Sequence, residues 1–243
     1  MEIILVDLES VKKNGRMDYD FYNPNQTKIA DMVAKDFTKD KLGNICLKNT
    51  TGKTAPRNSY PELGKRIIKV KNITGSGINW EPHFFVTPEF YEKAKKKSQV
   101  QIGDILMLCS AHSKVYIGRC DIINYFPEEV ITDNSQCCCV GELIIIRANP
   151  QKILPEYLIT FLRLPIVQEQ IKLMVKGQSA HLYPKDLANL DIILPSKKIQ
   201  EEIAILNREA HTEYFEKMKE AKGILNKARG KIIDIILNGK RNK

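Results

Sequence analysis

The sequence lacks the features that would place it in a membrane or in an oxidising compartment. Its longest apolar runs, such as residues 143–146, are far too short to span a bilayer. It has no N-terminal signal peptide, and its six cysteines include no Cys-x-x-Cys spacing. These absences predict a cytoplasmic protein with reduced thiols and no membrane partner.

Three of the cysteines are consecutive, and they raise the question of a zinc site. Cys137, Cys138 and Cys139 would need His112 or His181 as a fourth ligand. Successive residues of a strand point to opposite faces, so three in a row cannot converge on one ion without distortion. We therefore predict small buried side chains in a strand and no metal site.

The sequence also lacks a complete nucleotide-binding loop. Gly52, Lys53 and Thr54 resemble the end of a P-loop, whose backbone N–H groups bind phosphates. However, Leu47 stands where the first glycine of that motif belongs, and Pro56 would disturb the helix that has to follow. The segment is therefore predicted to be an ordinary exposed loop.

Motifs of other enzyme classes are missing as well. An acid-x-Lys spacing, which a metal-dependent nuclease needs beside further carboxylates, occurs only at Glu220 and Lys222. Asn23 and Pro24 do not continue into the Asn-Pro-Pro-aromatic tetrapeptide of a methyltransferase, and no Gly-x-Ser-x-Gly turn of a hydrolase is present. We predict a protein that is not itself an enzyme and that binds no cofactor.

What the sequence does contain is an excess of positive charge. The net charge is +9, from 38 Lys and Arg against 29 Asp and Glu. This balance favours an anionic partner, and nucleic acid is the first candidate. The lysine-rich run at 93–97 would suit a DNA backbone, although such runs more often form a solvated face.

Residues 1–195 have the pattern of a mixed α+β domain. Strand-like runs alternate with loops rich in Gly, Asn, Ser and Pro, and no ladder of βαβ units is present. A helical stretch at 155–176 is interrupted at Pro165, which is expected to begin a second helix. The strand-like runs are residues 66–70, 104–109, 115–123, 137–147 and 190–194.

Residues 196–243 have a different composition. Apolar or small residues recur every three or four positions from Ile199 to Ile235 with no intervening proline, which predicts one long coiled-coil-type helix from about residue 198 to 237. A seam of this length favours packing against another helix. The alternative is a C-terminal core helix that folds back on its own domain.

Motifs spread over most of the chain resemble the DNA specificity subunit of type I restriction-modification systems. The order and spacing of these motifs carry the resemblance, since no single one is specific. They are Arg-Met-Asp-Tyr-Asp-Phe-Tyr-Asn-Pro at 16–24, Gly-Lys-Thr-Ala-Pro at 52–56, Arg-Ile-Ile-Lys-Val-Lys-Asn-Ile at 66–73, Gly-Asp-Ile-Leu at 103–106, Ile-Leu-Pro-Glu-Tyr-Leu at 153–158, Gly-Gln-Ser at 177–179, Lys-Asp-Leu at 185–187, Leu-Pro at 194–195 and Gln-Glu-Glu-Ile at 200–203.

The chain departs from the family pattern in two respects. Residues 109–115 replace the usual Ser-Gly-rich turn, and the chain carries one target recognition domain with one long helix where the usual subunit carries two such units. The resemblance implies a non-catalytic subunit that selects a double-stranded DNA sequence. Separate DNA adenine methyltransferase subunits would then methylate the site, and an ATP-dependent restriction subunit would cut the DNA.

The candidate DNA-binding residues lie in three polar loops. Lys53 and Arg57 can neutralise phosphates, whereas the amide of Gln178 can pair with N6 and N7 of adenine. Neighbouring hydroxyl, amide and imidazole groups can contact phosphates or base edges. The full candidate set is Lys53, Thr54, Arg57, Asn58, Tyr60, Ser110, His112, Ser113, Lys114, Gln178, Ser179 and His181.

The apolar seam of the long helix predicts a homodimer. Two copies packed antiparallel would bury both seams and place the two domains at opposite ends, so the DNA site would have two identical half-sites. The alternative function is a helical adaptor whose α+β domain binds a protein and makes no contact with nucleic acid. The predicted dimer contacts are Ile203, Leu206, Met218, Leu225 and Ile232.

Overall fold

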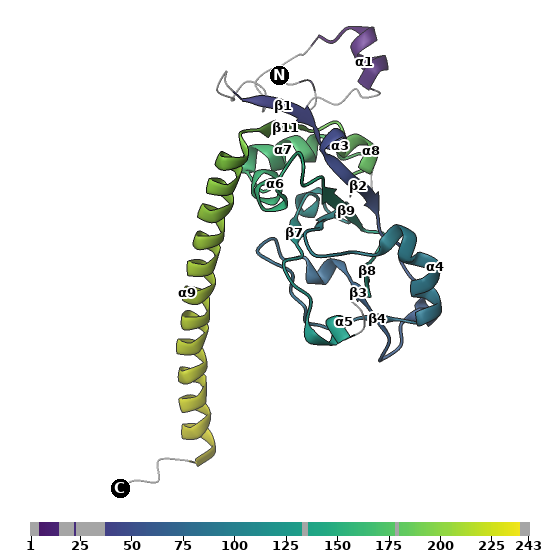
Figure 1. Cartoon of the computed structure of the whole chain (residues 1–243). Coiled ribbons are helices and arrows are strands. Elements are labelled where there is room, and N and C mark those ends of the chain that lie inside the picture. The colour runs from purple at the N-terminus through teal and green to yellow at the C-terminus, as the bar shows by residue number, and fades with distance from the viewer. Residues whose placement is uncertain (1–4, 15–21, 23–36, 133–135, 178–179, 239–243) are drawn as a thin grey trace.

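The computed structural model describes residues 5–14, 22, 37–132, 136–177 and 180–238 of the chain. It has a mixed α+β domain, and one long helix, α9 (Lys197–Asn238), extends along one side of this domain (Figure 1). The predicted fold class is therefore confirmed. The motif at 16–24 lies almost entirely outside the described residues. Before it, a short helix, α1 (Leu8–Asn14), is described.

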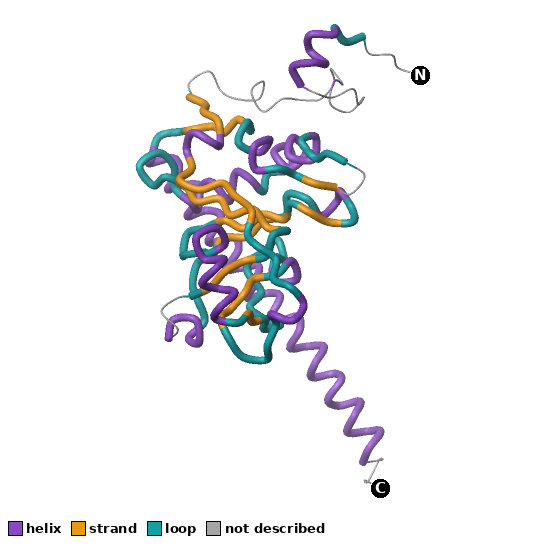
Figure 2. The backbone as a smooth tube through the Cα atoms, turned by 90° about the vertical axis from the view of Figure 1, so that its right-hand side faces the viewer, coloured by secondary structure: helices purple, strands orange, loops and turns teal. Residues whose placement is uncertain are grey.

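A four-stranded antiparallel sheet lies at the centre of the domain. Its strands, in spatial order, are β2 (Cys46–Thr51), β9 (Leu143–Ala148), β5 (Ile105–Leu108) and β7 (Cys120–Ile122). The orange strands of this sheet cross the middle of the domain in Figure 2.

The central sheet separates two hydrophobic cores. Alternate residues of a strand face opposite sides, so Ile144 and Ile146 of β9 join the first core and Leu143 and Ile145 join the second. All four side chains are fully buried. Burial on both faces explains why this part of the sequence is a continuous apolar run instead of an alternating pattern.

Two helices cover the first core, α6 (Pro155–Leu162) and α7 (Pro165–Leu173). Each begins with a proline, whose missing N–H has no helical partner to lose in the first turn. The predicted break at Pro165 is therefore confirmed. Smaller elements complete this layer, namely α3 (Leu42–Ile45), α8 (Pro184–Leu187), and the antiparallel pair β1 (Thr38–Lys41) and β11 (Asp191–Leu194).

The second core lies on the other face, under a three-stranded sheet and two helices. The strands are β4 (Phe85–Val86), β3 (Lys65–Ile68) and β8 (Cys137–Cys139), and the helices are α4 (Pro88–Ser98) and α5 (Glu128–Thr132). Since β3 pairs antiparallel with β4 and parallel with β8, this sheet is mixed.

The consecutive cysteines form β8 and are fully buried in the second core. Burial raises the pKa of the Cys138 thiol to about 12, so the thiol stays protonated at neutral pH. The prediction of small packed side chains in a strand is confirmed. Within the described ranges, no group of three or more His, Cys, Asp or Glu residues is arranged to hold a metal.

Two of the predicted strands are wrong in extent because a glycine interrupts each of them. The run at 115–123 contains Gly118 at φ +90°, a conformation that favours glycine, and only Cys120–Ile122 forms a strand. The run at 137–147 turns at Gly141, so its two halves belong to different sheets. An apolar pattern gives the burial of such segments, but it does not show where the chain turns.

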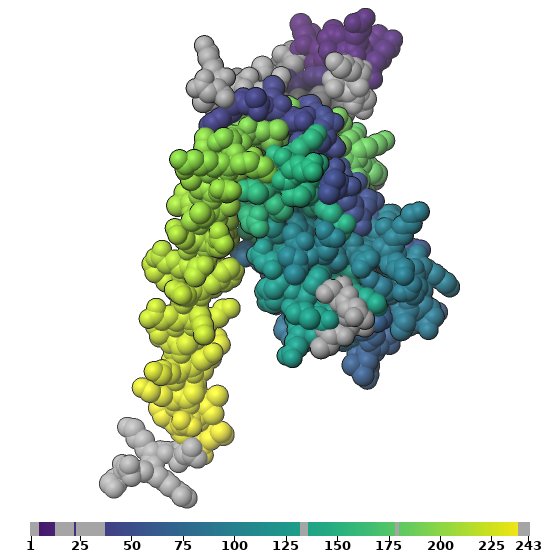
Figure 3. Space-filling model, viewed as in Figure 1, coloured from purple at the N-terminus to yellow at the C-terminus, as the bar shows by residue number. Residues whose placement is uncertain are grey.

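Only the first turns of α9 pack on the domain. Gln200 and Ala204 are buried there, and Oε1 of Gln200 accepts a hydrogen bond from the backbone N–H of Leu154 at 2.9 Å. The side chains of residues 212–237 are exposed, and Figure 3 shows the C-terminal half of the helix standing away from the domain. No described helix is both long and apolar enough to cross a membrane.

The buried carboxylate of Asp104 predicts a large effect on stability. It precedes β5 and accepts hydrogen bonds from Nε and Nη2 of Arg147 on β9, at 2.7 and 2.8 Å. We expect Asp104→Asn to lower the free energy of unfolding by about 2–4 kcal/mol, because it removes the countercharge of a half-buried guanidinium. Urea denaturation measures the change.

The matched control is Asp191→Asn, which removes the exposed ion pair between Asp191 and Lys41 (2.7 Å). Solvent screens this pair, so we expect a loss below about 1 kcal/mol. Equal losses in the two variants would contradict the prediction.

Candidate nucleic-acid interface

The loop at 52–60 begins where β2 leaves the edge of the central sheet. Gly52 is buried there, and a Cβ at this position would lie only 2.3 Å from the carbonyl oxygen of Cys139 and 2.4 Å from that of Val140. The N–H of Lys53 donates to the Cys139 carbonyl at 3.0 Å. Glycine is thus required for close backbone packing, which differs from its role in a P-loop.

Thr54 fastens the loop to the turn between β8 and β9. Its Oγ1 accepts a hydrogen bond from the N–H of Gly141 at 2.9 Å and donates one to Oε2 of Glu142 at 2.7 Å. A hydroxyl has one hydrogen to donate. In this structure, therefore, the Thr54 hydroxyl holds the loop and has no hydrogen left for a phosphate.

The outer part of the loop presents charged and polar side chains to solvent. After Pro56 the chain forms a single 3₁₀ turn at Arg57–Ser59, and the side chains of Arg57 and Asn58 are exposed on it. Lys53 is also exposed, with its Nζ 5.9 Å from the ring centroid of Phe90 on α4. These three residues are free to contact a large anionic partner.

Tyr60, at the end of the loop, packs against Lys69, which is not one of the candidate residues predicted from the sequence. The Nζ of Lys69 lies 3.6 Å from the centroid of the Tyr60 ring and 4.5 Å from that of Phe84. Burial raises the pKa of the half-buried Tyr60. Lys69 falls within the predicted strand at 66–70, but β3 ends at Ile68 and Lys69 is half-buried. The Lys-Val-Lys alternation at 69–71 is the only sequence signal for an accessible side chain here.

The second and third candidate loops form one structure. Strands β6 (Ser110–Ala111) and β10 (Ala180–His181) pair antiparallel, with His181 opposite Ser110. His112 and Lys114 are exposed beyond β6, and the side chain of Ser113 accepts from the N–H of Val115 at 3.4 Å. Gln178 and Ser179 lie outside the described residues, so their predicted contacts keep the status of predictions.

The turn at 140–142 joins these loops to the loop at 52–60. On one side it holds Thr54, as described above, and on the other the carbonyl of Glu142 accepts a hydrogen bond from the N–H of Cys109 at 2.9 Å. The carbonyl of Cys109 in turn accepts from the N–H of Leu182 at 2.8 Å. Hydrogen bonds therefore connect three segments that are far apart in the sequence, namely residues 52–60, 110–114 and 180–181. We call the exposed surface of these segments the candidate interface.

The comparison with protein-family models identifies the chain. The model described as "Type I restriction modification DNA specificity domain" matches residues 34–207. The chain belongs to this family. The resemblance drawn from its motifs is thus confirmed, and the matched part of this specificity domain contains every loop of the candidate interface together with the first turns of α9.

Solved structures show the same fold at low sequence identity. A chain from a structure on complex assembly and conformational transition of the type I R-M system has a TM-score of 0.56 and 16% identity, over 93% of this chain and 50% of that one. The HsdS subunit from Thermoanaerobacter tengcongensis has a TM-score of 0.53 and 17% identity, with coverages of 89% and 47%. The S subunit from M. genitalium has 0.55 and 13%, with 89% and 49%.

The chain therefore spans about half the length of the solved chains that it resembles. No curated protein sequence gives a significant match.

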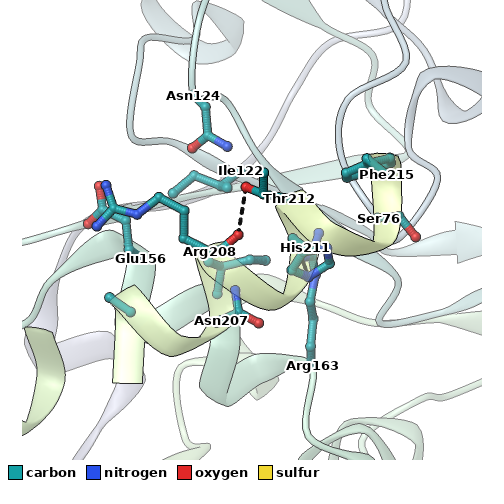
Figure 4. Close-up of a pocket in the computed structure, with 12 residues that line it drawn as sticks. Ser76, Ile122, Asn124, Glu156, Arg163, Asn207, Arg208, His211, Thr212 and Phe215 are labelled. Carbon is teal, nitrogen blue, oxygen red and sulfur yellow. Dashed lines mark hydrogen bonds between the residues drawn. The ribbon is translucent and has the colours of Figure 1, made fainter. Parts of the chain in front are cut away.

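The specificity domain also has a hollow of about 430 Å³ at the root of α9, between this helix, α6 and the end of β7 (Figure 4). Arg163 lines it, donating to the buried carboxylate of Asp121 at 2.5 Å and lying 3.3 Å from Nε2 of His211. Burial, followed by the charge of Arg163, lowers the pKa of His211. Arg163 is thus already paired within the domain, and none of the residues lining this hollow belongs to the candidate interface.

The tether at Thr54 can be tested by substitution. Thr54→Val keeps the shape of the side chain but leaves the N–H of Gly141 without its acceptor, so we expect a loss of about 1–2 kcal/mol in the free energy of unfolding. Faster hydrogen exchange at the Gly141 amide is expected as well. Thr54→Ser retains the hydroxyl and is the control, and identical behaviour of the two variants would show that the tether contributes nothing.

Proposed function

We propose that the chain selects a DNA sequence by placing the candidate interface against duplex DNA, without catalysing a reaction itself. One observation carries this proposal. The described segments of three loops that are distant in the sequence are joined by backbone hydrogen bonds and by the Thr54 hydroxyl, and they expose polar and basic side chains such as Lys53, Arg57 and Lys114. Binding residues are commonly carried by loops that a rigid scaffold positions.

The residues of this surface differ in the contacts that they can make. Lys53, Arg57 and Lys114 are exposed cations that can neutralise phosphates. Asn58 and His181 carry both donors and acceptors, so they can also contact base edges. Phosphate contacts would set the position of the domain on the duplex, and base contacts would select the sequence.

The exposed apolar stripe on α9 supports a role in pairing two copies of the chain. Leu206 is 69% exposed, Leu225 57% and Ile232 54%, and Met218 also remains accessible at 38%. Ile203, the fifth predicted contact, instead lies half-buried against the first core of its own domain. The predicted interface therefore begins beyond the root of the helix.

Two antiparallel copies of α9 would bury these stripes and hold two domains at opposite ends. Its 42 residues correspond to a helix about 60 Å long. This length would limit the centres of two identical half-sites to fewer than about 18 base pairs apart. Because one chain spans about half of the related solved chains, two copies would supply the full length of such a subunit.

The outer faces of the paired helices would then be available to partner subunits. The partners that the family suggests are DNA adenine methyltransferase subunits and an ATP-dependent restriction subunit. In this arrangement the chain determines where its partners act, and they carry out methylation and cleavage.

The phosphate contacts predict a change in salt dependence. Replacing both Lys53 and Arg57 with Ala should weaken binding to all duplexes about equally, and should reduce the slope of log affinity against log salt by about one to two units. Fluorescence anisotropy over a salt series measures both quantities. Wild-type affinity in the double variant would remove these residues from the interface, whereas salt-insensitive or absent binding by the wild-type chain would favour the protein-binding adaptor.

The pairing of α9 predicts an oligomeric state. Light scattering should give twice the 27.8 kDa mass of one chain, and Leu206→Asp or Leu225→Asp should shift the species toward one chain, because each places a charge in the apolar contact. Lys219→Asp adds the same side chain at an exposed position off the stripe and should leave the dimer intact. A stable monomer that neither Leu variant alters would contradict pairing through α9.

A further inference from the structure

A surface hollow beside the loop at 52–60 is lined by two lysines, Lys69 and Lys71, and by a carboxylate that the interface described so far does not use. The hollow has a volume of about 350 Å³ and includes Thr54, Tyr60, Lys69, Phe84 and Glu142 in its lining. Lys69 and Glu142 are each half-buried. Lys69 faces this space from the residue after β3, and Glu142 faces it from the turn at 140–142.

Lys69 is a cation held in place by aromatic rings. Its Nζ lies 3.6 Å from the Tyr60 centroid and 4.5 Å from the Phe84 centroid, distances at which the ring faces attract an ammonium group. No carboxylate in the described ranges forms an ion pair with it. Burial lowers the pKa of Lys69, so the ammonium has lost part of its hydration and gains from a new acceptor.

Glu142 is an acceptor whose position is also fixed. Its Oε2 accepts the hydroxyl hydrogen of Thr54 at 2.7 Å, and Thr54 is itself fixed by the N–H of Gly141. Its Oε1 accepts no hydrogen bond from the part of the chain that the structure describes. The hollow therefore presents one donor held by aromatic rings and one oriented acceptor, and the exposed Lys71 also lines it.

We propose that Lys69 and Glu142 together read one G·C base pair in the major groove, an inference that rests on the proposed function of this surface in DNA binding. The O6 and N7 atoms of guanine accept from a lysine, and the N4 amino group of cytosine donates to a carboxylate. In an A·T pair, the N6 amino group of adenine would oppose Lys69 and O4 of thymine would oppose Glu142.

The presence of the carboxylate distinguishes a base edge from a phosphate. A phosphate offers only acceptors and a negative charge, so it would gain from Lys69 and Lys71 but would be repelled by Glu142, whose Oε1 it cannot supply with a hydrogen. A G·C edge offers an acceptor and a donor, and both groups gain. The fixed positions of the Lys69 ammonium and the Glu142 carboxylate also suit base recognition, because a displaced donor loses the alignment that discriminates one base from another.

The test is selection from a random duplex library by the purified full-length chain and by each of two variants. The wild-type chain should enrich a motif of two inverted half-sites, each with a G·C pair that depends on this hollow. Lys69→Met should reduce the preference for G·C at that one position by about 5- to 150-fold and leave the other positions unchanged.

Glu142→Gln gives a sharper expectation. Its amide oxygen can still accept from Thr54, so its NH₂ group takes the place of Oε1 and becomes a donor. A donor there suits O4 of thymine, and Lys69 can still donate to N7 of adenine. The preference at the same position should therefore move from G·C toward A·T.

The control is Lys39→Met, which removes the same charge from an exposed side chain on β1, away from the hollow, and its base preferences should equal those of the wild type. Thermal unfolding checks that each variant is folded. If Lys69→Met is not, Glu142→Gln decides the proposal alone, because it keeps the hydrogen bond to Thr54.

The possible failures can be told apart. A wild-type motif that both variants retain, with weaker binding to every sequence, would make Lys69 a phosphate contact and overturn the proposal while sequence-specific binding stands. Failure of the wild-type chain to enrich any motif would overturn the proposed function itself.

Discussion

Strand β9 has to be buried on both faces, and the remainder of the domain follows from this constraint. Its aliphatic side chains point alternately into two cores, so neither face can be left to water. Helices α6 and α7 cover one side, whereas α4, α5 and the small mixed sheet cover the other. Near the end of β9, Arg147 forms an ion pair with the buried carboxylate of Asp104. This ion pair fixes β9 to β5 in addition to the backbone pairing of the two strands.

The candidate interface is attached to the end of this strand. The turn at 140–142 precedes β9, and its backbone groups hold both the loop at 52–60 and the segment that leads into β6. The loops are therefore anchored mainly by main-chain atoms and by the Thr54 hydroxyl, while side chains such as those of Arg57 and Asn58 point to solvent. Such an arrangement allows the exposed side chains to vary with little effect on the fold, as the proposed selection of DNA sequences would require.

Helix α9 differs in kind from the rest of the molecule. Its root is fixed by the buried Gln200 and Ala204 and by the contact of His211 with Arg163, which is held by Asp121. Farther along, the apolar side chains face solvent, an arrangement in which the hydrophobic effect favours association with a second apolar surface. The same helix thus extends from the domain and carries the apolar surface through which we propose that two copies of the chain pair.

The sequence by itself determined the class of fold, the long helix, the helix break at Pro165 and the family, because each depends on local periodicity, on a residue with restricted backbone geometry or on the order of motifs. It also located the loop at 52–60 and the exposure of Arg57, since glycine and proline mark turns independently of their surroundings. It did not show that the run at 137–147 serves two sheets.

Only the tertiary structure decided which loops meet, that the Thr54 hydroxyl is engaged by Gly141 and Glu142, and that Lys69 lies against Tyr60 and Phe84. These contacts join segments separated by up to 88 positions in the sequence. Local pattern carries no information about such pairings, because they arise from the way in which the two cores bring distant strands and turns together around β9.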